Sequence, residues 1–163
     1  MANEVEQFIE LWENESGVTR ALLETVPKDK YDFRPDPEGR SLGELAWHLA
    51  ALEAIFSSMA RDRSFKKPDG LELPRTVPEI VSGYERIHRE SVERVRVLRP
   101  AELDLEFPFI GGRSISVRNV LRFPLLHHSI HHRGQLMMMI RMAGGVPARV
   151  YGPNREDMTP ART

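Results

Sequence analysis

Inward-facing residues recur along four stretches of the chain at alternating steps of four and three, the spacing that places them on one face of an α-helix. In the first stretch this stripe consists of Val5, Ile9, Trp12, Ser16, Thr19, Leu23 and Val26. Three connections of roughly a dozen residues, rich in proline, glycine and charge, separate the four stretches. No strand pattern competes with this reading. The pattern therefore predicts an all-α fold, a four-helix bundle with long crossover connections.

Local signals predict where the helices begin and end. Ser41 with Glu44, and Thr76 with Glu79, have the spacing of a capping box. Pro124 lies within the last stretch and should kink or restart that helix. We predict one domain over residues 1–163 and a tail at 146–163, with helices at roughly 4–26, 41–62, 77–99 and 116–143. Long connections leave the relative directions of the helices open.

Composition narrows the set of partners. The formal net charge is −1, so no overall field draws the chain to nucleic acid or to an anionic membrane. No window approaches the roughly 20 apolar residues of a membrane span, and the N-terminus has no basic start or apolar run. We therefore expect a cytoplasmic protein with no nucleic-acid or membrane partner. The chain has no cysteine, so any thiol chemistry would need a thiol that arrives with a ligand.

Histidines are concentrated in the fourth stretch, where four of the six lie within residues 126–135. His127 with His131, and His128 with His132, have the i, i+4 spacing that lets two imidazoles reach one ion. The second pair shares its face with residues suited to the bundle interior, Leu121, Leu125, Gln135, Met139 and Met142. We therefore favour His128 and His132 as metal ligands and His127 and His131 as flanking surface.

A third ligand could come from His48, which lies beside the leucine stripe of the second predicted helix. Three neutral imidazoles suit zinc, and nickel nearly as well, and leave a coordination position open as in catalytic zinc sites. The simpler alternative is a core histidine hydrogen-bonded to a neighbour. Spacing alone does not show that the second and fourth helices are neighbours.

Three segments carry a resemblance to a known family. SLGELAWHL at 41–49, HSIHHRGQL at 128–136, and the ending from GGVP at 144–147 through YGP at 151–153 resemble motifs of the DinB-like, or YfiT-like, metal-binding bundles. The resemblance implies a site made by His48, His128 and His132. It also implies frequent homodimers and a divalent metal that varies among zinc, nickel and manganese.

The resemblance also implies a chemistry, because characterised relatives include transferases that use a low-molecular-weight thiol, such as bacillithiol or mycothiol, and isomerases that depend on one. We therefore expect a metal-dependent transferase or isomerase, with a small-molecule thiol and an electrophile as its partners. Two alternatives remain: a metal-binding or sensing bundle without turnover, and a metal-dependent hydrolase.

Several other residues have more than one reading. Arg133 could hold a carboxylate of a thiol cofactor or substrate, or form an interhelix salt bridge. Gln135, one turn beyond His132, could contact a bound ligand, close a polar network or be a buried structural amide. For the methionines we favour core packing over a pocket lining, and for His88 a structural role. The methionines are Met137, Met138, Met139 and Met142. The sequence assigns no catalytic acid or base.

Overall fold

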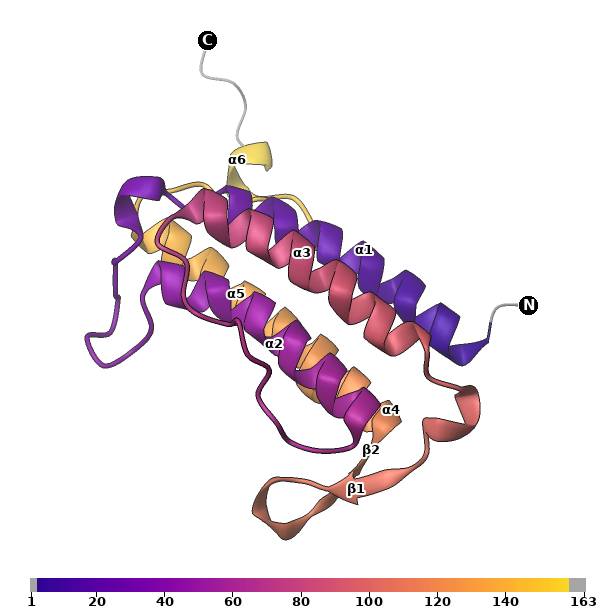
Figure 1. Cartoon of the computed structure of the whole chain (residues 1–163). Helices are drawn as coiled ribbons and strands as arrows, with labels where there is room; N and C mark the ends of the chain where they lie inside the picture. Colours follow the sequence, from indigo (N-terminus) through magenta and orange to yellow (C-terminus); the bar gives the residue numbers. More distant parts are fainter. Residues whose placement is uncertain (1–2, 159–163) are drawn as a thin grey trace.

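Four helical segments lie lengthwise against one another in the computed structural model, which describes residues 3–158 (Figure 1). The all-α bundle predicted from the hydrophobic pattern is confirmed. The long helices are α1 (Glu4–Glu24), α2 (Leu42–Asp62), α3 (Val77–Arg96) and α5 (His128–Met142). Shorter helical pieces are η1 (Lys28–Lys30), η2 (Pro100–Glu102), η3 (Ile110–Gly112), α4 (Val117–Val120), η4 (Leu121–His127) and α6 (Arg155–Met158).

Capping boxes start the helices where the sequence predicts them. The Ser41 N–H donates to the Glu44 carboxylate at 2.8 Å, and the Glu44 N–H donates to the Ser41 hydroxyl at 3.2 Å. Thr76 and Glu79 form the same reciprocal pair at α3. These bonds satisfy backbone N–H groups that the first turn of a helix cannot pair. The first and third helices end two and three residues earlier than expected, within the fraying of helix ends.

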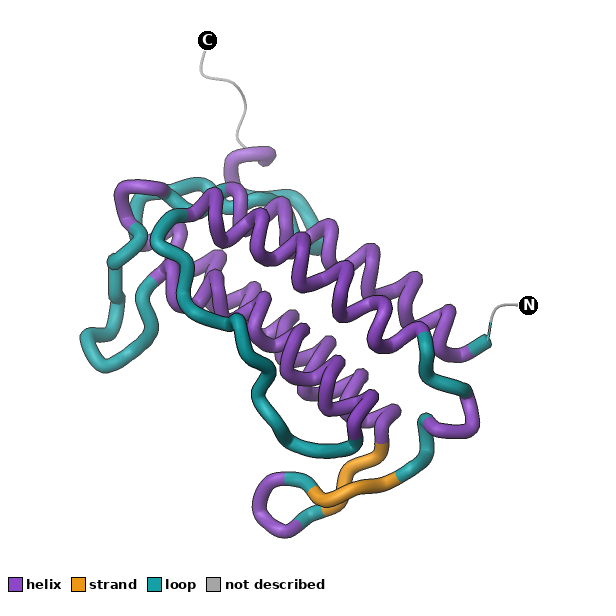
Figure 2. The backbone as a smooth tube through the Cα atoms, in the orientation of Figure 1, coloured by secondary structure: helices purple, strands orange, loops and turns teal. Residues whose placement is uncertain are grey.

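The helices alternate in direction only in part. In Figure 1, α1 and α5 run one way along the bundle, and α2 and α3 run the other way. The parallel pair α2 and α3 therefore needs a connection as long as the bundle, and residues 63–76 provide it as the extended loop of Figure 2. Each of α2 and α3 contacts the other, α3 also contacts α1, and α2 also contacts α5. This order places α2 beside α5.

A small β-hairpin joins α3 to the last helical segment, which corrects the expectation that no strands form. Strand β1 (Glu106–Pro108) pairs antiparallel with β2 (Ser114–Ser116). The turn uses Gly111 and Gly112, both with a φ of 72°, a conformation that glycine adopts without steric cost. Strands of three residues are too short for an alternating pattern to be recognised.

Proline reshapes the start of the last helix, as predicted. Residues Leu121–His127 form a π-helical turn around Pro124, and the regular helix α5 begins at His128. Proline has no N–H and its ring crowds the carbonyl four residues earlier, so a wider turn relieves the clash. The His128 N–H accordingly reaches back to the carbonyl of Phe123. The distortion lies directly before the histidine pair.

The apolar stripes form the core around α2, which packs against the long helices α3 and α5 and against the shorter η4 and α4. Its buried side chains join two clusters, one containing Trp12, Phe56 and Leu125 and the other containing Leu45, Tyr84 and Leu136. No helix among residues 3–158 is long and apolar enough to cross a lipid bilayer.

Candidate metal centre

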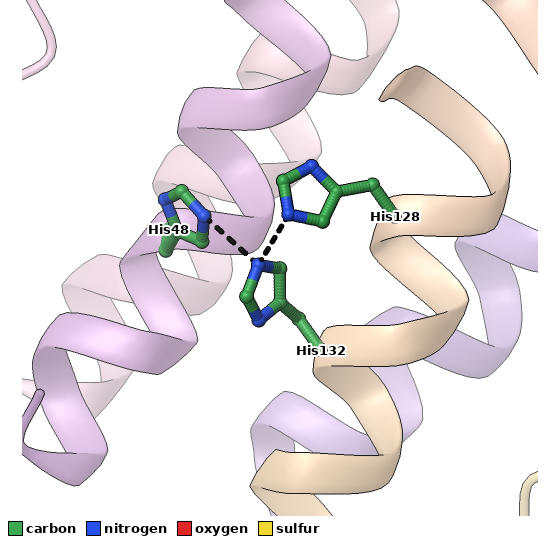
Figure 3. A group of neighbouring side chains, drawn as sticks. All are labelled: His48, His128 and His132. Atoms are coloured by element: carbon green, nitrogen blue, oxygen red, sulfur yellow. Dashed lines mark hydrogen bonds between the residues drawn. The ribbon is translucent and has the colours of Figure 1, made fainter. Parts of the chain in front are cut away.

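Three histidines point toward one another between α2 and α5 (Figure 3). His48 Nε2 lies 3.1 Å from His132 Nε2, which lies 2.8 Å from His128 Nε2. All three ligand atoms lie within 4.8 Å of one another. For comparison, two nitrogens bound to one tetrahedral zinc at about 2.0–2.1 Å are separated by about 3.3 Å. The three ring nitrogens are thus within the distance at which one ion can contact them all.

Helix packing brings these side chains together. His128 and His132 are one turn apart on α5, so their imidazoles lie on one face of it. His48 projects from the neighbouring helix α2. The spacing of the residues could not show that α2 contacts α5. This contact brings His48 to the histidine pair on α5. His132 is buried, whereas His48 and His128 are partly exposed, so the cluster can be reached from solvent.

The surroundings keep the three imidazoles neutral near pH 7. Burial lowers the pKa of His48 to about 3, helped by the charge of Arg40 and by the other two histidines. Burial also lowers the pKa of His128 and of His132, helped by the charges of His131 and Arg40, although the hydrogen bond to Gln135 partly offsets the lowering at His132. Neutral imidazole is the form that binds a metal ion, so protons compete little for the site at neutral pH.

Gln135 orients one of the three rings. Its Oε1 lies 2.6 Å from His132 Nδ1. A carbonyl oxygen only accepts, so Nδ1 carries the proton in this contact and the neutral ring presents an unprotonated Nε2 to the cluster. Metal-binding histidines commonly use their second nitrogen in this way. Gln135 thus forms a polar contact with a histidine of the cluster, which is one of the roles expected from the sequence. The residue is exposed, so the reading as a buried structural amide is wrong, and contact with a bound ligand stays a prediction.

The outer histidines differ from the inner pair. His127 is exposed, and its ring packs edge-on against Phe123 at 5.3 Å between centroids. His131 is also exposed, but its ring lies 5.2 Å from that of His132. His131 is therefore at the border of the cluster, and His127 faces elsewhere.

Arg133 is engaged in the bundle. Its side chain is 1% exposed and forms a salt bridge with Glu15 of α1. It also donates to the Glu15 backbone carbonyl at 3.1 Å and to the Tyr151 hydroxyl at 2.5 Å. This is the interhelix salt bridge that the sequence left open. That Arg133 binds a cofactor carboxylate stays a prediction: Glu15 and Tyr151 already engage both terminal nitrogens of its guanidinium, and its buried Nε has no partner among the described residues.

A cavity of about 640 Å³ lies next to the cluster; none of the three histidines lines it, but two residues that contact His132 do. Gln135 and His131 form part of its wall, and so do Met138, Met139 and Met142. Met138 and Met142 are 60% and 58% exposed, so the core role expected for the methionine run is wrong for these two. Met137 and Met139 are partly buried and do pack against the core.

Arg40 also lines this cavity, and its charge acts on all three histidines. Sequence reasoning missed it because it lies in the connection before α2, far from the histidine motif. The sequence feature that could have indicated Arg40 is its position directly before Ser41, the residue that caps α2.

A second polar cluster was also missed. Glu53 of α2 is 3% exposed and accepts hydrogen bonds from Trp12 Nε1 at 3.2 Å and from the Tyr84 hydroxyl at 2.9 Å. His88 Nδ1 lies 2.7 Å from Glu53, and His88 Nε2 lies 3.2 Å from Glu13. Burial by itself lowers the pKa of His88, but bonds and charges of Glu53 and Glu13 outweigh it and raise that pKa. The structural role expected for His88 thus takes the form of an ion pair with a buried glutamate.

The sequence model of the DinB family matches residues 1–163. The chain belongs to the DinB family. The resemblance that rested on the three segments is thereby confirmed. This DinB family member is 27% identical to the uncharacterized protein YrdA of Bacillus subtilis over 159 residues, which cover 96% of this chain and 93% of YrdA.

Solved structures share the DinB fold. A DinB-like protein from Bacillus cereus superposes with a TM-score of 0.76 at 24% identity, over 90% of this chain and 97% of that protein. YjoA of Bacillus subtilis, also DinB-like, gives a TM-score of 0.68 at 21% identity, over 91% of this chain and 96% of YjoA. At these identities the likeness establishes the fold of this DinB family member and nothing about its reaction.

Proposed function

We propose that this protein binds a divalent metal ion, zinc in the first instance, through His48, His128 and His132. The single observation that carries the proposal is the convergence of three Nε2 atoms from two helices, at 2.8 and 3.1 Å along its two shorter edges. Three imidazoles make a donor set suited to zinc and nickel, whereas manganese prefers oxygen ligands and is proposed only from the family resemblance.

The state of the rings supports this fit. Their pKa values are all lowered, so protons do not hold the lone pairs at neutral pH. Gln135 fixes the proton of His132 on the far nitrogen. Two partly exposed ligands leave the cluster open to solvent on one side, as a site with an exchangeable coordination position requires.

We further propose that the protein is an enzyme that transfers a small thiol onto an electrophile. A bound divalent ion lowers the pKa of a coordinated thiol and so would supply a nucleophile at neutral pH. The thiol must come from solution because the chain has no cysteine. The cavity beside Gln135 and His131 offers a largely apolar wall against which the electrophile can be held.

A conjugation assay tests the transferase proposal. Protein loaded with zinc, nickel or manganese is mixed with chlorodinitrobenzene or monochlorobimane and with bacillithiol, mycothiol or glutathione in turn. We expect a rate above background that requires both metal and thiol and that is lost in His132→Ala. The matched control, His127→Ala, removes an exposed imidazole that faces away from the cluster and should keep the rate.

Other outcomes reject this activity in distinguishable ways. No rate above background with any of these thiols and metals would rule out the proposed transferase. Turnover of an ester without a thiol would indicate the hydrolase instead. Silence in both assays, together with a metal-dependent change in ligand affinity, would indicate a binding or sensing protein. The homodimer that the resemblance implies is also a proposal, and sedimentation velocity measures it directly.

A further inference from the structure

We propose that the cavity beside the three histidines binds small amphipathic anions, with Arg40 holding the anionic group and the α5 methionines covering the apolar body. This inference deepens the proposed function by naming the class of ligand that would approach the metal. Its test does not need the metal.

The size and lining of the cavity suit a small molecule. Its volume of about 640 Å³ falls within the roughly 300–1,000 Å³ typical of small-molecule sites. The wall is mainly apolar, formed by Leu45 of α2, Pro35 of the preceding loop and the methionines Met138, Met139 and Met142. Flexible thioether side chains adapt to ligands of different shape. The side chains of Met138 and Met142, one turn apart on α5, are exposed, and a ligand in the cavity would cover them.

Arg40 is exposed, and its positive charge acts on the three histidines and on Glu44 without forming an ion pair with any described residue. Its guanidinium forms no hydrogen bond or ion pair with any residue between Asn3 and Met158, although it carries five N–H donors. The nearby Glu44 carboxylate is already held by Arg34, at 2.8 and 2.7 Å, and by the Ser41 N–H. A planar guanidinium at the edge of an apolar cavity matches a carboxylate, sulfonate or phosphate.

The acidic residue Asp36 also lines the cavity, so its charge must be weighed in deciding whether the ligand is an anion or a cation. Its Oδ1 accepts from the Glu38 N–H at 3.1 Å, so this carboxylate already has a partner within its own loop. The donors of Arg40 have none. Asp36 keeps its charge and its second oxygen, but it forms no bond to Arg40 among the described residues, so the Arg40 guanidinium is left to hold an anion.

The cavity also lies where a ligand could approach the proposed metal. Gln135 is both part of the wall and the partner of His132 Nδ1. His131 is part of the wall, and its ring is 5.2 Å from that of His132. An anion held at Arg40 would thus sit beside the cluster without replacing any of its histidines.

Fluorescent probes test the proposal on the full chain, both metal-free and zinc-loaded. The anionic probe is 8-anilinonaphthalene-1-sulfonate, and the uncharged probe of similar shape is N-phenyl-1-naphthylamine. We expect saturable binding of the anionic probe to the folded protein. Arg40→Gln should weaken it about tenfold, as loss of a hydrogen bond to a charged group predicts, and should leave the uncharged probe unchanged.

Two further variants locate the effect. Arg89→Gln removes the same charge from an exposed position on α3, away from the cavity wall, and should bind both probes as the wild type does. Met138→Gln changes the apolar wall and should weaken both probes. Circular dichroism verifies that each variant is folded.

Several results would overturn the proposal. These are binding that does not saturate, an equal effect of the two arginine variants, and an equal loss of both probes in Arg40→Gln. Dimers that dissociate when the probe is added would assign this surface to a second copy of the chain instead. Failure of metal binding is separate: a chain that retains no metal but binds the anionic probe through Arg40 would refute the metal centre alone.

Discussion

Replacing the buried Glu53 by alanine should be one of the most destabilising single changes in the bundle. Glu53 accepts from Trp12 at 3.2 Å and Tyr84 at 2.9 Å, and pairs with His88 at 2.7 Å. Hydrogen bonds to a charged group contribute about 1.5–3 kcal/mol each, but bonds within one network do not add. Removing one partner of a buried ion pair costs about 3–5 kcal/mol, and we expect Glu53→Ala to lower the free energy of unfolding by this amount.

Urea unfolding followed by circular dichroism measures this cost. The control is Glu93→Ala on α3, where the carboxylate is 70% exposed and pairs with Arg96. A surface substitution of this kind should change the free energy of unfolding by less than about 0.5 kcal/mol. The two variants remove the same charge, so the difference between their free energies of unfolding measures the effect of burying the carboxylate and its partners.

The cost should also depend on pH through His88. Its folded pKa is raised above the unfolded value of 6.5, so the folded state binds the proton more tightly than the unfolded chain does. This contribution is fully present below pH 6.5 and is lost as the pH rises through the folded pKa. The difference between wild type and Glu53→Ala should therefore be larger at about pH 6 than at about pH 9. A cost no greater than that of Glu93→Ala, or one that does not change with pH, would refute the ion-pair assignment.

Two further substitutions test residues around the histidines. Arg133→Ala should lower the free energy of unfolding by about 3–5 kcal/mol because it leaves the largely buried Glu15 without its cationic partner, although the Tyr151 hydroxyl still donates to it. Tyr151→Phe should cost within about 1.5 kcal/mol, and equal costs in urea unfolding would contradict the assignment. Gln135→Leu should weaken zinc binding about 10–100-fold in competition with a chromogenic chelator because His132 Nδ1 loses its acceptor. Gln135→Glu keeps an acceptor and should retain most of the affinity; a Leu variant that binds zinc as tightly as the wild type would show that the contact does not matter.

Features encoded by neighbouring residues could be predicted from the sequence. The capping boxes at Ser41 and Thr76 act within one helical turn, and so does the spacing of His128 and His132. The distortion at Pro124 follows from the geometry of its ring. In each case the physical cause lies within about four residues, the range over which helical periodicity can be followed.

Features that depend on distant segments could not be predicted in the same way. The ion pair of Glu53 with His88 joins two helices, and nothing in the spacing of either helix indicates a polar partner on the other. Arg40 reaches the cavity only because the loop before α2 folds over α5 residues such as Gln135. The strands of the hairpin are too short to leave a pattern. The family resemblance implied that His48 belongs to the cluster. The position of its ring beside the other two depends on the packing of α2 against α5.

Metal analysis of protein purified without a histidine tag tests the central claim most directly. Elemental analysis of the wild type should find about one transition-metal ion per chain, with His127→Ala unchanged and His128→Ala nearly empty. The two variants remove adjacent imidazoles, of which only His128 belongs to the cluster. Wild-type protein that holds no transition metal even after incubation with zinc, or a His128→Ala protein that holds as much as the wild type, would contradict the account.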